Sequence, residues 1–95
     1  MQEHAAAVLA GLAPLGDNAK AIQEAEGIEP LVSLLSAGNA SAKIHAAATI
    51  GELALRAGAA LEIAKAGAVH AFVNWLVDPK LGPPEVAARY TNSGV

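Results

Sequence analysis

Apolar side chains recur along the chain at the spacing of an α-helix. Between residues 42 and 56, one helical face carries a set of small and branched aliphatic residues: Ala46, Ala47, Ile50, Leu53 and Ala54. Alternation of apolar and polar residues is scarce, and so are runs of β-branched residues. About a quarter of the chain is alanine, the strongest helix former. The pattern therefore predicts an all-α fold.

Glycine, proline and capping residues divide the pattern into short helices. We expect helices over residues 18–25, 29–36, 42–56, 59–65, 69–77 and 85–90. Asp17 is expected to cap the first of these and Asn39 or Ser41 the third, because their side-chain oxygens bond free N–H groups at a helix start. Gly27 is expected to supply the backbone conformation of a sharp turn. Pro30 is expected near the first position of the next helix, where a missing N–H costs little.

The pattern also repeats along the chain. A shift of 41 positions places His4 on His45 and superimposes the alanines that follow them. The same shift, continued without a gap, predicts further equivalent pairs: Ile22 and Ile63, Ile28 and Val69, Leu31 and Phe72, Leu34 and Trp75, and Leu35 and Leu76. A period of this length is typical of helical solenoids, in which each unit packs on its neighbours.

We therefore expect one solenoid domain over residues 1–95. Residues 1–15 match only a third helix, residues 16–56 form a full unit, and residues 57–90 form an incomplete unit. Residues 91–95 lack apolar periodicity and are expected to fray. Because solenoid ends without polar capping units expose apolar surface, we expect the chain to self-associate through its ends.

The segment NAKAIQEAEGIEPLVSLLSAGNASAKIHAAATIGELA, residues 18–54, resembles an armadillo repeat. EIAKAGAVHAFVNWL, residues 62–76, matches the same pattern in the following unit. The resemblance implies a right-handed superhelix of three-helix units. It also implies that the third helices line a concave groove, where the chain binds a partner protein or an extended peptide as an interaction scaffold.

On that implication, the partner-binding residues lie on the exposed side of the third helices. The candidates in the three successive units are His4, Val8 and Gly11; His45, Thr49, Glu52 and Arg56; and Arg89 and Tyr90. Peptide-binding members of the family usually carry an Asn on this helix and a Trp one turn before it. Here Gly11 and Glu52 stand at the Asn position, and Ala7 and Ala48 stand at the Trp position. This departure argues against basic targeting peptides held by a ladder of Asn side chains.

Composition and charge argue against several other classes of function. A net charge of −3 without a basic cluster argues against nucleic-acid binding. The absence of cysteine removes disulfides, thiolate metal sites and cysteine nucleophiles. No apolar run comes close to the length of a membrane-spanning helix, which is about 18 residues or more. His4 and His45 lack the further ligands of a zinc site, and Glu24, Glu26 and Glu29 lack a partner nucleophile. We expect no cofactor, no metal and no enzymatic activity, and an intracellular location in the cytoplasm or nucleus.

Two alternatives to an interaction scaffold stay open. One helix face offers His45, Thr49, Glu52 and Arg56, so a HEAT-like helical-repeat enzyme or enzyme subunit is the second hypothesis. A purely structural spacer that binds nothing through the groove is the third. Trp75 is expected to pack in the core of its helix rather than to anchor a partner.

Overall fold

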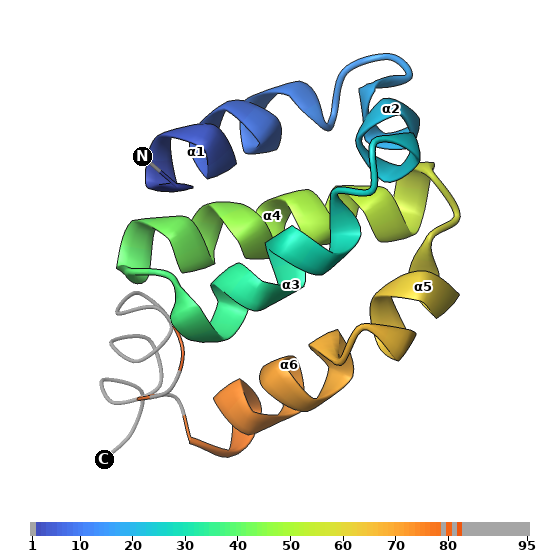
Figure 1. Ribbon diagram of the computed structural model, residues 1–95. Coiled ribbons are helices and arrows are strands. Elements are labelled where there is room, and N and C mark those ends of the chain that lie inside the picture. Colours follow the sequence, from blue (N-terminus) through green and yellow to red (C-terminus); the bar gives the residue numbers. More distant parts are fainter. Residues whose placement is uncertain (1, 79, 81, 83–95) are drawn as a thin grey trace.

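All regular secondary structure that the computed structural model describes is helical (Figure 1); the described residues are 2–78, 80 and 82. The helices are α1 (Gln2–Leu12), α2 (Asn18–Glu24), α3 (Ile28–Ala37), α4 (Ala40–Arg56), α5 (Ala60–Lys65) and α6 (Ala68–Val77). The prediction of an all-α fold is confirmed. The helix expected over residues 85–90 and the tail expected over residues 91–95 lie outside the described residues.

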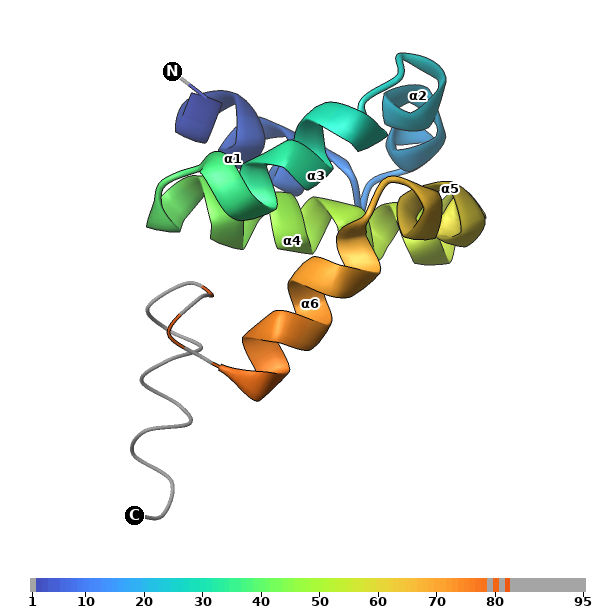
Figure 2. The same ribbon diagram turned by 60° about the horizontal axis from the view of Figure 1, so that its bottom comes forward.

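Helix α4 is the centre of the fold. α1 lies beside α4 and runs in the same direction, whereas α3 and α6 run the opposite way (Figures 1 and 2). α1, α2, α3 and α5 contact α4, and α3 also contacts α5 and α6. α1 and α4 are therefore equivalent helices of successive units, and the pair α2–α3 is equivalent to the pair α5–α6. The helical solenoid expected from the repeat is confirmed.

The core is built mainly from alanine and branched aliphatic side chains. Ala42, Ala46 and Leu53 of α4 are fully buried at helical spacing. Ala6 of α1 and Ala13 just after it are buried as well. Because alanine has the shortest side chain with a Cβ, two helices that meet through alanines can approach closely. The high alanine content thus fits the close pairing of the helices.

The helix starts follow the expected chemistry only in part. Asn39 caps α4, and its Oδ1 accepts a hydrogen bond from the Ala42 N–H at 2.9 Å. Asp17 stands before α2, but its side chain makes no capping hydrogen bond, so its predicted role is wrong. Pro30 is the third residue of α3 rather than the first. Its missing N–H is still harmless, because the first four N–H groups of a helix have no intrahelical acceptor.

The turn between α2 and α3 differs from the prediction. Gly27 has an ordinary right-handed conformation with φ −78°, whereas Glu26 is left-handed with φ 61°. Position 27 requires a glycine because there is no room for a side chain. A Cβ there would lie 2.8 Å from Cγ2 of Ile22 and 3.0 Å from the carbonyl oxygen of Ile22. In the turn between α5 and α6, Gly67 is itself left-handed with φ 96° and directly precedes the helix. The second turn is therefore one residue shorter than the first.

This shorter turn makes the uninterrupted shift of 41 wrong beyond it. Before the turn, Ile22 and Ile63 are both buried, as the shift predicts. After the turn, Leu35 is 1% exposed but Leu76 is 66% exposed, so the two residues are not equivalent. Trp75, at 8%, is the buried counterpart of Leu35. The residues of α3 and α6 correspond through a shift of 40.

The corrected register explains the aromatic residues of α6. The corrected pairs are Ile28 and Ala68, Leu31 and Ala71, Val32 and Phe72, Leu34 and Asn74, and Leu35 and Trp75. The rings of Phe72 and Trp75 pack edge to face with their centroids 5.2 Å apart. The prediction that Trp75 packs in the core is confirmed, although its equivalent is Leu35 and not Leu34.

Candidate interaction surfaces

The predicted binding residues of α1 and α4 form a strip across two neighbouring helices. His4, Val8 and Gly11 are exposed on α1. On α4, Glu52 is half-buried and Arg56 is exposed; the half-buried His45 completes the set. The two helices α1 and α4 lie side by side and run in the same direction (Figure 1). Arg89 and Tyr90 lie outside the described residues.

Thr49 does not belong to this strip. Its exposed fraction is 0%, and its Oγ1 donates a hydrogen bond to the carbonyl oxygen of His45 at 2.9 Å. The prediction that Thr49 contacts a partner is therefore wrong. Its equivalent in α1, Val8, is 59% exposed, so the same helix position is covered in one unit and open in the other. Sequence spacing places the residue at the edge of the buried face and does not show which neighbour covers it.

Glu52 and Arg56 are the charged pair of the strip. Arg56 Nε donates to Glu52 Oε2 at 2.6 Å, with side chains 51% and 28% exposed. An exposed pair one helical turn apart contributes little to stability. The guanidinium keeps further N–H donors and the carboxylate keeps further lone pairs. The pair can therefore offer donors and acceptors to a polypeptide backbone at the same point.

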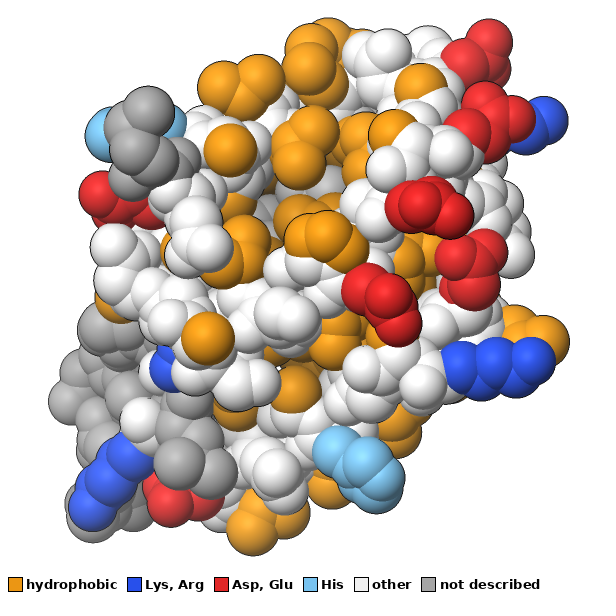
Figure 3. Space-filling model, viewed as in Figure 1, with side chains coloured by type: hydrophobic (Ala, Val, Ile, Leu, Met, Phe, Trp, Pro, Cys, Tyr) orange, Lys and Arg blue, Asp and Glu red, His pale blue; other side chains and the backbone are white. Residues whose placement is uncertain are grey.

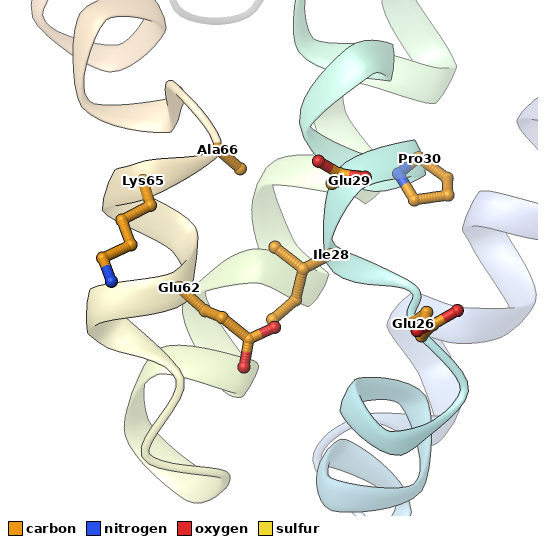
Figure 4. Close-up of a pocket in the computed structure, with 7 residues that line it drawn as sticks. All are labelled: Glu26, Ile28, Glu29, Pro30, Glu62, Lys65 and Ala66. Atoms are coloured by element: carbon orange, nitrogen blue, oxygen red, sulfur yellow. The ribbon is translucent and has the colours of Figure 1, made fainter.

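An acidic cleft of about 450 Å³ lies between α3 and α5 (Figure 4). Its charged lining residues are Glu26, Glu29, Glu62 and Lys65. Gln23 Nε2 donates a hydrogen bond to Glu62 Oε1 at 2.9 Å, which ties α2 to α5. Glu26 and Glu29 were noted from the sequence as an acidic cluster, whereas Glu62 and Lys65 of α5 were not. They come from the next unit, and only the stacking of units brings them to the cleft.

An apolar groove of about 320 Å³ lies between α1 and α3, where Figure 3 shows apolar side chains at the surface. None of its lining residues is charged, and they are Gln2, Ala5, Ala6, Leu9, Gly27, Pro30, Leu31, Ser33, Leu34 and Ala37. The repeat pattern predicts apolar surface at the ends of the solenoid but does not predict this groove. The sequence pattern does not show that α1 and α3 lie side by side, and the groove depends on that placement.

Within residues 2–78, 80 and 82, no three His, Cys, Asp or Glu side chains are grouped so that they would hold a metal ion. None of the helices described there combines the length and the hydropathy that crossing a bilayer requires.

Residues 17–55 match the family model described as Armadillo/beta-catenin-like repeat. The matched segment begins one residue before α2 and ends one residue before the end of α4. It therefore coincides with the three-helix unit that α2, α3 and α4 form. Comparisons with curated proteins and with solved structures found no match.

Proposed function

Because this chain contains a repeat of the armadillo family, whose members are generally protein-interaction scaffolds, we propose that it binds a partner protein or an extended peptide on the strip formed by α1 and α4. The observation that carries the proposal is the side-by-side placement of these equivalent helices (Figure 1). His4 and His45 stand at the same position of successive units, and so do Gly11 and Glu52. A repeated surface suits a ligand that is itself repetitive, such as an extended backbone.

The chemistry of the strip favours a ligand held by mixed contacts. Glu52 and Arg56 supply an acceptor and donors on α4, whereas α1 supplies the exposed apolar side chain of Val8. Gly11 leaves space on α1, since nothing lies within 4 Å of the place where its Cβ would be. We therefore propose an extended segment that bonds Glu52 and Arg56 through its backbone and places an apolar side chain over Val8.

The enzyme hypothesis is the weaker of the alternatives. Armadillo repeats are typically non-enzymatic. The His, Thr, Glu and Arg residues that suggested a reaction centre do not converge on an open pocket: the Thr49 hydroxyl is buried and bonded to the backbone. Glu52 and Arg56 are bonded to each other. A catalytic pocket needs polar groups that point at a common ligand.

The proposal is tested by selecting peptides from a displayed random library with the wild-type chain. The affinity of a selected peptide is then measured by calorimetry for the double variant Glu52→Ala, Arg56→Ala. The matched control is Lys20→Ala, Glu24→Ala on α2, which removes an exposed acid and an exposed base with the same spacing. Both double variants are checked for helicity by circular dichroism.

We expect the affinity to fall at least tenfold in the α4 variant and to stay unchanged in the α2 control. Equal affinity for both variants would place the binding site elsewhere and contradict the proposal. Failure to select any peptide from libraries of extended segments would favour the spacer hypothesis.

A further inference from the structure

We draw no further inference here: the strongest candidate, the apolar face that Val69, Val73 and Leu76 expose on α6, carries none, because nothing in the structure shows what covers it.

Discussion

Glu26 and Gly67 hold the same left-handed backbone conformation in the turns before α3 and α6, with φ 61° and 96°. They are 41 positions apart, so they are also equivalent in the repeat. A residue with a Cβ is strained in this region and glycine is not. One turn therefore stores strain that the other avoids.

This relationship predicts opposite effects of two substitutions. Glu26→Gly should stabilise the fold by about 0.5–1 kcal/mol, because relief of strain exceeds the added entropy of the unfolded chain. Gly67→Ala should destabilise it by about 1–2 kcal/mol. Urea unfolding measures both changes, and a Glu26→Gly variant that is less stable than wild type would show that Glu26 contributes a contact that outweighs its strain.

Gly27 is predicted to be intolerant for a steric reason. Gly27→Ala places a Cβ within 2.8 Å of Ile22 Cγ2, and we expect a loss of about 1–3 kcal/mol, as in overpacked cores. Gly51 is the matched control, since nothing lies within 4 Å of its Cβ position in α4. Gly51→Ala should raise stability by about 0.5–1 kcal/mol through helix propensity. The midpoint temperature of thermal unfolding should therefore fall in Gly27→Ala and rise in Gly51→Ala.

The corrected register predicts which residue of α6 supports the fold. Trp75→Ala should cost about 3–5 kcal/mol, whereas Leu76→Ala should change stability by less than about 0.5 kcal/mol. The physical reason is that Trp75 is 8% exposed and Leu76 is 66% exposed. Denaturation followed by circular dichroism measures both without relying on the single tryptophan. If Leu76→Ala lost more stability than Trp75→Ala, Leu76 would be the counterpart of Leu35, and the shift of 41 would hold in α6 as well.

Asn39 joins two successive units as well as capping α4. Its Oδ1 accepts from the Ala42 N–H, and its Nδ2 donates to Glu3 Oε2 of α1 at 2.8 Å. Asn39→Ala should cost about 1–2 kcal/mol, because both bonds are lost. Asn39→Ser keeps a capping oxygen and loses only the contact with Glu3, so it should cost less. Chemical denaturation measures the free energy of unfolding of both variants. If Asn39→Ala and Asn39→Ser lose the same amount, the capping hydrogen bond contributes nothing to stability.

Thr49 and Glu52 should separate stability from binding. Thr49→Ala removes a buried methyl and hydroxyl, and we expect a loss of about 1–2 kcal/mol in stability with unchanged affinity for a selected peptide. Glu52→Ala should lower the affinity for the peptide and leave the stability nearly unchanged, because Glu52 is partly exposed and its pair with Arg56 is weak. Unfolding and calorimetry on the same preparations test this, and a Thr49 variant that folds normally but no longer binds would contradict it.

The candidate surfaces were predictable from the sequence to different degrees. The repeat placed His4, His45 and Arg56 on the third helices, because helical periodicity defines the faces of one helix. It misplaced Thr49, since burial at the edge of a helix face depends on the neighbouring helix. The apolar face of α6 was hidden by the register error, as the uninterrupted shift set Leu76 against the buried Leu35 rather than the exposed Ser36.

The sequence by itself determined the all-α class, the repeated three-helix plan and the approximate helix boundaries, because propensity, capping and apolar spacing act within one or two turns of chain. The tertiary structure decided the backbone conformations of Glu26, Gly27 and Gly67, the partners of Trp75, and the acidic cleft and apolar groove. These features depend on where helices from different units meet. That placement follows from side-chain packing between units, which local spacing along the chain does not encode.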